Sequence, residues 1–366
     1  MKKIINYFKL KYIENYDYKK IIIAIIIIFV AILSLFFSKQ IEILLRLDYN
    51  FTEINNSKAQ VHFLDVGQGD CVAIRFSNNE TALIDCGAPD SEKKLTKYLD
   101  NIFFKNSNRK FDYAILTHTD SDHIGNFSSL LNKYEFNNIY LPKNIINHEV
   151  YSEIYKNIVE KNYNVYFNFE GISLNISDDS VLQWLSPTSN FYDNDNDYSP
   201  IINASINGFN FLFTGDASIA IENIVLMNYD ISNIDVLKVG HHGSNFSTSY
   251  DLLAETQPQN IVFSVGENNY GHPSSEVIER IANYQNDYGV KINLYETKDK
   301  GNLIFMINND LIFANIDNIN RYFFIDWWIV VIIFILIYSI IFIVKRNYAI
   351  NKVYQRSITK TKNNTK

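Results

Sequence analysis

The sequence predicts a mixed α/β domain in which two β-sheets pack face to face with helices outside, an αββα sandwich, between two transmembrane helices. Short apolar runs of strand length alternate with segments of helical spacing across residues 59–310. Several of these runs end in histidine and aspartate clusters, and two uncharged apolar runs, 21–37 and 327–344, flank the region. Strands interspersed with helices favour two packed sheets covered by helices.

The first half of the domain alternates strands and helices, separated by turns such as Gly67-Gln68-Gly69-Asp70. Its strands are expected at Gln60–Asp65, Cys71–Phe76, Thr81–Asp85, Phe111–Thr117 and Asn138–Leu141, and its helices at Glu92–Phe104 and Phe127–Tyr134.

The second half repeats this alternation, and a hairpin of 290–296 with 303–308 closes the domain. Its strands are expected at Val165–Phe169, Ser173–Ile176, Val181–Leu185, Ile201–Asn207, Phe209–Thr214, Val236–Val239 and Asn260–Val265, and its helices at Ser218–Met227, Tyr250–Thr256 and Ser274–Tyr284. The asparagine- and aspartate-rich stretch 190–198 is expected to be a surface loop.

Residues 21–37 and 327–344 have the length and composition of short membrane-spanning helices. The tails 1–20 and 345–366 are basic, so the positive-inside rule places both termini in the cytoplasm. Connectors 38–58 and 311–326 then lead to an extracytoplasmic domain, and the lipid bilayer is an expected partner. A cleaved signal peptide is the alternative for the first run, but no small-x-small cleavage pattern follows it.

The stretch 21–344 contains 20 basic and 38 acidic residues, which gives it a formal charge of −18. Such a field repels polyanions unless a local patch or a bound metal offsets it. Cys71 and Cys86 are the only cysteines. A disulfide and two buried thiols are both compatible with their positions.

The segment His118-Thr119-Asp120-Ser121-Asp122-His123 contains four ligand-type side chains directly after an apolar run. Imidazole nitrogens and carboxylate oxygens suit Zn²⁺, Mn²⁺ or Fe²⁺, and these four residues are numerous enough to help hold two ions. The alternative is a polar loop that caps a helix, but a cap needs one such residue. The pattern therefore predicts a metal site.

Two further predicted strands end in ligand-type residues, at Asp216 and at the pair His241-His242. Residues at three strand ends can meet at one sheet edge. Adjacent histidines point in different directions, so we expect one of the pair to bind metal and the other to contact substrate or the leaving group. His272 lies before a helix as a substrate-side residue or an incidental imidazole, whereas ordinary structural roles are expected for His62 and His148.

The ordered motifs resemble the metallo-β-lactamase fold, in the version found in the C-terminal domain of ComEC/Rec2 competence proteins. They are Leu64-Asp65-Val66-Gly67-Gln68-Gly69-Asp70, Leu83-Ile84-Asp85-Cys86-Gly87, the 118–123 cluster, Thr214-Gly215-Asp216, Val239-Gly240-His241-His242-Gly243-Ser244 and Gly271-His272-Pro273-Ser274. The resemblance covers residues 59–310 and implies a hydrolase with two divalent metal ions. Its implied ligands are His118, Asp120, Asp122, His123, Asp216 and His242, with Asp216 between the ions.

Two departures from the commonest version of that fold bear on the metal. Asp120 stands where that version has a second histidine, a change that the ComEC-like subgroup shares. The usual third-motif histidine has no counterpart in the corresponding region, 202–206. The ion beside His118 and Asp120 is therefore expected to bind weakly, and the carboxylate-rich site shifts the balance from Zn²⁺ toward Mn²⁺.

The resemblance implies a phosphodiesterase or nuclease that uses a metal-activated hydroxide, with DNA as one candidate substrate. Asp122 would orient the water, and His241 or His272 would assist the leaving group. An extracytoplasmic esterase for teichoic-acid or phosphorylcholine phosphodiesters is a second reading, because the acidic field opposes DNA binding. A non-catalytic, membrane-tethered binding module is the third, and the missing histidine favours it. The channel region of competence proteins has no counterpart between the two apolar runs.

Overall fold

A computed structural model describes residues 57–105, 107–143 and 149–315, with 342, 346 and 349–350. The basic tail and apolar run at 1–37, and nearly all of 327–344, lie outside the described residues. Within the described part of the chain, no helix is long and apolar enough to cross a bilayer. The two anchors and their orientation therefore stay predictions.

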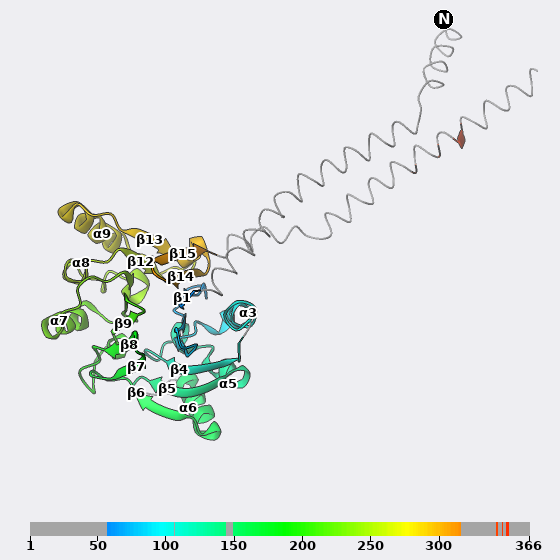
Figure 1. The fold of residues 1–366 in the computed structure, drawn as a ribbon, viewed down its shortest axis with the longest axis horizontal. Coiled ribbons are helices and arrows are strands. Elements are labelled where there is room, and N and C mark those ends of the chain that lie inside the picture. Colours follow the sequence, from blue (N-terminus) through cyan, green and yellow to red (C-terminus); the bar gives the residue numbers. More distant parts are fainter. Residues whose placement is uncertain are drawn as a thin grey trace, which may run out of the picture. The chain divides into compact units, whose positions relative to one another are not determined.

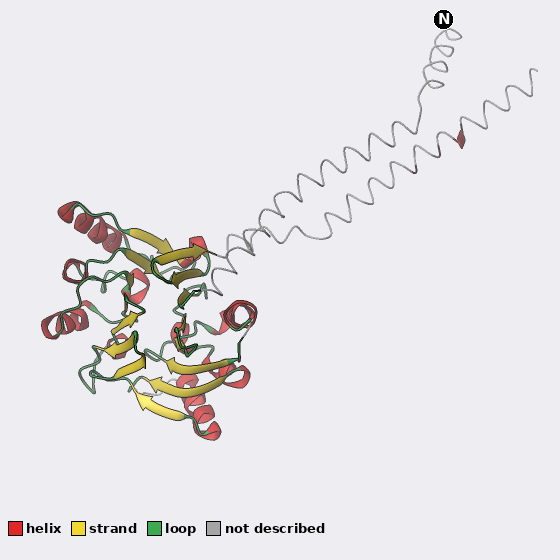
Figure 2. Ribbon diagram, viewed as in Figure 1, coloured by secondary structure: helices red, strands yellow, loops and turns green. Residues whose placement is uncertain are grey.

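The domain contains two mixed β-sheets packed against each other, with helices on both outer faces (Figures 1 and 2). The first sheet, in spatial order, consists of β15 (Leu311–Asn315), β14 (Leu303–Ile307), β1 (Ala59–Phe63), β2 (Val72–Arg75), β3 (Thr81–Ile84), β4 (Lys110–Ile115), β5 (Glu135–Leu141) and β6 (Asn164–Phe167). The second consists of β13 (Asn293–Glu296), β12 (Asn260–Phe263), β11 (Val236–Lys238), β10 (Phe209–Phe213), β9 (Ile202–Ile206), β8 (Ser180–Trp184) and β7 (Ser173–Ser177).

Three apolar layers hold the sandwich together. The middle layer lies between the sheets, where Phe63 and Phe305 of the first sheet meet Phe211 and Phe213 of the second. The two outer layers pack helices onto the sheets. On the first sheet these are α3 (Glu92–Tyr98), α5 (Phe127–Lys133) and α6 (Glu149–Lys161), and on the second α7 (Ile219–Asn228), α8 (Tyr250–Thr256) and α9 (Ser275–Tyr288). The predicted two-sheet α/β architecture is confirmed.

The predicted closing hairpin is wrong, because its two strands belong to different sheets. β13 runs parallel to β12 in the second sheet, whereas β14 runs antiparallel to β1 in the first. The short helix α10 (Thr297–Lys300) and Gly301, at φ +74°, connect them. Two apolar runs separated by a short polar turn look like a hairpin in sequence, but these two runs pair with strands of two different sheets.

Further elements differ from the sequence expectation. Helix α6 and strand β15 were not predicted, and the helix expected over 92–104 is α3 followed by a π-helical turn, Leu99–Phe103. Four-residue α4 (Ser121–Ile124) lies inside the predicted metal-binding segment, which therefore combines a strand end with one helical turn.

Candidate metal centre

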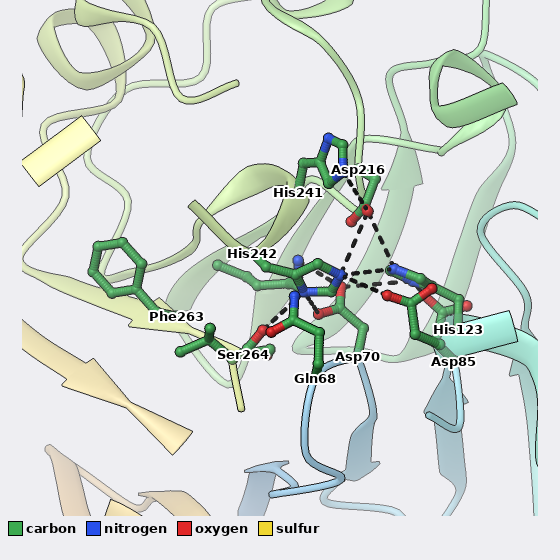
Figure 3. A network of polar contacts seen from close by, with 12 residues as sticks. Gln68, Asp70, Asp85, His123, Asp216, His241, His242, Phe263 and Ser264 are labelled. Carbon is green, nitrogen blue, oxygen red and sulfur yellow. Dashed lines mark hydrogen bonds and ion pairs between the residues drawn. The ribbon is translucent and has the colours of Figure 1, made fainter. Parts of the chain in front are cut away.

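Strands of both sheets end beside one polar cluster (Figure 3). From the first sheet, β3 leads to Asp85 and β4 leads to the 118–123 segment. From the second sheet, the parallel neighbours β10 and β11 lead to Asp216 and to the His241-His242 turn. This convergence brings together residues that lie far apart in the sequence, as expected of strand ends at a common edge.

Asp85 positions the 118–123 segment through both of its carboxylate oxygens. The Thr117 backbone N–H donates to Asp85 Oδ1 at 2.8 Å and the Thr117 hydroxyl donates to Oδ2 at 2.7 Å. His123 Nδ1 also lies 2.8 Å from Oδ2 and donates to it. With its proton held on Nδ1, neutral His123 presents its Nε2 lone pair as a ligand atom, an arrangement common for histidines that bind metals.

His118 and His242 are oriented in the same manner. The Thr117 hydroxyl, which donates to Asp85, lies 3.1 Å from His118 Nδ1 and accepts from it. His242 Nδ1 donates to the Ser264 carbonyl at 2.8 Å. Both histidines therefore direct Nε2 into the cluster, and His242 Nε2 lies 3.3 Å from His123 Nε2 and from Asp122 Oδ2.

Asp216 lies at the centre of the cluster. Its Oδ2 is 3.2 Å from the Nε2 atom of His123, 3.6 Å from that of His242, 3.7 Å from that of His241 and 3.9 Å from that of His118. The Asp216 side chain is 3% exposed, so this carboxylate is buried among four imidazoles.

His241 and His242 form a strained turn. Their φ angles are +46° and +53°, in the left-handed region that non-glycine residues rarely adopt, and their ring planes differ by 71°. His242 is buried, whereas the His241 side chain is 30% exposed. The structure brings both Nε2 atoms near Asp216, so both histidines belong to the site.

The remaining predicted site residues lie around this centre. Asp120 is the most exposed carboxylate, with its Oδ2 3.6 Å from His118 Nε2. His272 stacks edge-on against His241 at 5.6 Å between ring centroids, and exposed Tyr270 lies against His272 at 5.9 Å. His241, His272 and Tyr270 thus form a line of rings from the cluster toward solvent.

The acidic stretch expected to be a surface loop is in part a wall of the site. Residues Asp195–Tyr198 form a short 3₁₀ helix with a buried Tyr198. The Asn196 side-chain amide lies 3.3 Å from His241 Nδ1, and the buried Ser199 hydroxyl lies 3.3 Å from His118 Nδ1 while accepting from the Asp216 backbone N–H. Ser199, which directly follows this turn, therefore contacts His118.

Two further residues of the cluster, Asp70 and Lys238, were missed as site residues by sequence reasoning. Asp70 is buried and belongs with His123, Asp216 and His242 to a group whose ligand-type atoms lie within 4.8 Å of one another. Lys238 Nζ lies 2.5 Å from Asp70 Oδ2. The available signal was a lysine inside the apolar strand 236–239, because lysine is rarely buried unless it is paired.

The cluster shifts the pKa values of its members strongly. Burial opposes ionisation of Asp216, but His123 and His242 outweigh it and hold the pKa of Asp216 well below its usual range. Burial likewise opposes charge on His242, yet Asp216, Asp122 and Asp70 raise its pKa to about 10. Without a metal ion, protonated imidazoles supply the positive charge that these carboxylates require. A divalent cation can supply the same charge when those protons leave.

The donor set fits metal ions, because two buried polar atoms of the cluster have no hydrogen-bond partner. Among the described residues, these atoms are His118 Nε2 and Asp216 Oδ1. Leaving buried polar atoms unpaired is costly, and metal coordination is one way to satisfy them. Two imidazole nitrogens with two or more carboxylates suit Zn²⁺ and Mn²⁺ alike.

Among the described residues, His62, Cys71 and Cys86 do not belong to this donor set. His62 is buried in β1, bonded to Tyr98 and Gln60, and burial lowers its pKa to about 3. His148 lies outside the described residues. Cys71 and Cys86 are buried free thiols, which decides between the two alternatives that the sequence left open.

Comparisons with known proteins agree with the site. The model of the metallo-beta-lactamase superfamily matches residues 64–264, more than half of the chain. ComE operon protein 3 of Bacillus subtilis (strain 168) is 27% identical over 270 residues, 69% of this chain and 34% of that protein. Recombination protein 2 of Haemophilus influenzae is 29% identical over 236 residues, 64% of this chain and 28% of that protein.

The chain thus spans about a third of the length of these curated relatives. Among solved structures, the metallo-beta-lactamase fold protein YhfI of Bacillus subtilis matches 67% of this chain and 99% of its own with a TM-score of 0.46 and 13% identity. The family match covers the strand ends that carry Asp85, His118, His123, Asp216 and His242. This chain belongs to the metallo-beta-lactamase superfamily, and its curated relatives are ComEC/Rec2-type competence proteins.

Proposed function

We propose that this protein is a membrane-anchored, metal-dependent hydrolase of phosphodiesters. The observation that carries the proposal is the position of Asp216 Oδ2 within 3.9 Å of four imidazole Nε2 atoms. A carboxylate so placed can bridge two cations. The membership of a superfamily of metal-dependent hydrolases supports the same chemistry.

Two overlapping sets of residues would hold the ions. His118, Asp120 and Asp216 make one set, and Asp122, His123, His242 and Asp216 make the other. Bound divalent ions lower the pKa of a water toward neutrality and neutralise charge on the attacked phosphate. Asp120 is 45% exposed, and the first set has one histidine fewer than the second. The first set would therefore bind its ion more weakly and favour Mn²⁺ over Zn²⁺.

Asp122 would hold the attacking water. Its Oδ2 lies 3.3 Å from His242 Nε2, and its side chain is 32% exposed, so one side of the carboxylate remains open to solvent. Burial disfavours its ionisation, but His242 and His123 lower its pKa to about 2. Ionised Asp122 can accept a hydrogen bond from water and orient it.

His241 would assist the departing oxygen. When the Asn196 amide donates to His241 Nδ1, the neutral ring carries its proton on Nε2, on the side that faces Asp216. Burial lowers the pKa of both His241 and His272. Nε2–H of His241 can therefore donate a hydrogen bond to a leaving alkoxide beside the bridging carboxylate, with His272 as the outer wall.

The substrate is proposed to be a phosphodiester of nucleic acid, in line with the competence-protein relatives. The formal charge of −18 over residues 21–344 favours a second candidate, a phosphodiester of the cell envelope such as a teichoic-acid or phosphorylcholine ester. Both termini would lie in the cytoplasm and the domain outside it, anchored in the bilayer by 21–37 and 327–344.

The test uses the full chain in detergent with Mn²⁺ or Zn²⁺. Bis-p-nitrophenyl phosphate, single-stranded DNA and p-nitrophenylphosphorylcholine are offered separately. We expect metal-dependent turnover of the first two, and D122A and D216A should each lower it by at least about a hundredfold. D112A is the matched control, because Asp112 lies in β4 away from the cluster and bonds Thr81.

The outcomes separate the candidates. If the protein cleaves the small esters but does not cleave DNA, the result favours the envelope substrate. Retained turnover in D122A or D216A contradicts the assigned roles, and absence of both turnover and bound metal in the unmodified chain favours a binding module.

A further inference from the structure

Lys238 carries a buried positive charge in the floor of the metal centre. Its side chain is 2% exposed, and its Nζ lies 2.5 Å from Asp70 Oδ2, 3.0 Å from the Val239 carbonyl and 3.2 Å from the Gly215 carbonyl. An ammonium group has three N–H donors, so these three acceptors satisfy it completely. Lys238 therefore has no N–H donor left for a substrate, and all of its hydrogen bonds are made within the protein.

The three acceptors of Lys238 belong to three separate loops of the site. Gly215 directly precedes Asp216, Val239 precedes the turn with His241 and His242, and Asp70 closes the loop between β1 and β2. The His241 backbone N–H also donates to the Gly215 carbonyl at 3.1 Å. One ammonium group thus links the loops that carry Asp70, the bridging carboxylate and the histidine pair.

Asp70 extends these links to the first sheet through its backbone. Its N–H donates to the Asp122 carbonyl at 3.1 Å, and its own carbonyl accepts from the Gly87 N–H at 2.9 Å. The approach is so close that a Cβ on Gly69 would lie 2.3 Å from the Asp122 oxygen. Glycine at position 69 therefore allows the 67–70 turn to pack against the segment that contains Asp122, which places the Asp70 carboxylate beside that segment.

The Asp70 carboxylate lies on the Nδ1 side of the two buried histidines, His123 and His242. Its Oδ1 is 3.4 Å from His242 Nδ1, and its Oδ2 is 3.9 Å from His123 Nδ1 (Figure 3). The Nε2 atoms of the same rings face Asp216 and each other. Asp70 therefore supports the Nδ1 edges together with Asp85 and the Ser264 carbonyl.

We propose that Asp70 and Lys238 are positioning residues of the metal centre, which pre-form the half that contains His123 and His242. The inference rests on the proposed metal-dependent function. Buried carboxylates that lie close together repel one another, and the Lys238 side chain pairs with one of them without occupying a ligand position. Groups that orient metal-binding histidines contribute strongly to metal affinity although they do not touch the ion.

The principal test is the double variant D70N/K238M of the full chain. Removing both charges together leaves no unpaired buried charge, so the variant is expected to fold. K110M/D112N is the matched control, because it removes a Lys–Asp pair, 3.0 Å apart, from β4 outside the cluster. Mn²⁺ and Zn²⁺ affinity and stoichiometry are measured by competition with a chelating indicator, independently of activity.

We expect the same number of ions at saturation and a metal affinity about 10- to 100-fold weaker in D70N/K238M, with no change in the control. D70N alone, which keeps an oxygen for Lys238, is the second variant should the double one not fold, and it should also bind more weakly. Unchanged affinity overturns the proposal. Loss of one ion at saturation also overturns it, since Asp70 would then be a direct ligand. If the unmodified chain binds no metal, the proposed function itself fails.

Discussion

The Asp85 carboxylate holds the His123 imidazole by a 2.8 Å contact between Oδ2 and Nδ1 while it also accepts two hydrogen bonds from Thr117. Both side chains are fully buried. Asp85, which directly follows β3, therefore fixes the tautomer of His123 in α4, in the segment that follows the parallel strand β4. This relationship gives the first prediction.

D85N should weaken metal binding by about 10- to 100-fold while the fold is retained. The one oxygen of Asn can still accept from the Thr117 backbone N–H, but its amide –NH2 cannot accept the Nδ1 proton of His123. Metal affinity measured by indicator competition is the readout. Affinity within a factor of two of the unmodified chain would show that His123 does not depend on Asp85.

N196A should slow hydrolysis of diesters with poor leaving groups and leave p-nitrophenyl esters almost unaffected. The Asn196 amide orients His241, and only a poor leaving group needs help with its proton. The comparison is the ratio of kcat for an alkyl ester to kcat for an aryl ester, which cancels errors in enzyme concentration. Equal loss on both substrates contradicts a role for His241 in the leaving-group step.

G69A should destabilise the domain and impair metal binding together. Its added Cβ would meet the Asp122 carbonyl at 2.3 Å, and Gly69 adopts φ +145°. G208A is the control, since Gly208 has φ +87° with nothing within 4 Å of an added Cβ, so it isolates the backbone strain of about 1 kcal/mol. Thermal melts and metal titrations distinguish them. If G69A has the same melting temperature as G208A and binds metal normally, an added Cβ at position 69 does not disturb the Asp122 carbonyl.

His62 should make the domain less stable in mild acid. Burial lowers its pKa to about 3, from about 6.5 in the unfolded chain. Between these two values the unfolded state binds a proton that the folded state does not, so stability falls as pH decreases. The expected slope is about 1.4 kcal/mol per pH unit, and above pH 6.5 the effect vanishes.

The check for His62 is a series of urea melts of the unmodified chain and H62F at several pH values between 7 and 4. H62F loses the bonds to Tyr98 and Gln60, so its stability at pH 7 should be lower. Its profile should nevertheless be flatter in acid. Parallel profiles for the two proteins would assign the acid sensitivity to other groups.

Much of the fold and part of the site follow from the sequence. Strands that end in ligand-type residues lead to the cluster, and Asp216 and His242 lie beside His123 although more than 90 residues separate them. Apolar runs mark strands because burial imposes that pattern wherever both faces of a sheet are covered.

Other parts depend on tertiary contacts that no local pattern shows. The hairpin prediction failed because β13 and β14 pair with partners in different sheets. Composition alone made 190–198 look like a solvated loop, yet Asn196 within it contacts His241, and Ser199 directly after it contacts His118. Lys238 lies in a strand whose residues are all buried, and its partner Asp70 is distant in the sequence.

The number of metal ions bound per chain tests the central claim most directly. The full-length protein is equilibrated with excess Mn²⁺ or Zn²⁺, separated from free metal and analysed for metal content alongside D216A. The account predicts about two ions per chain, with the more weakly held one on the His118 and Asp120 side, and a marked loss in D216A because this carboxylate serves both sites. Fewer than one ion per chain, or undiminished metal in D216A, would contradict it.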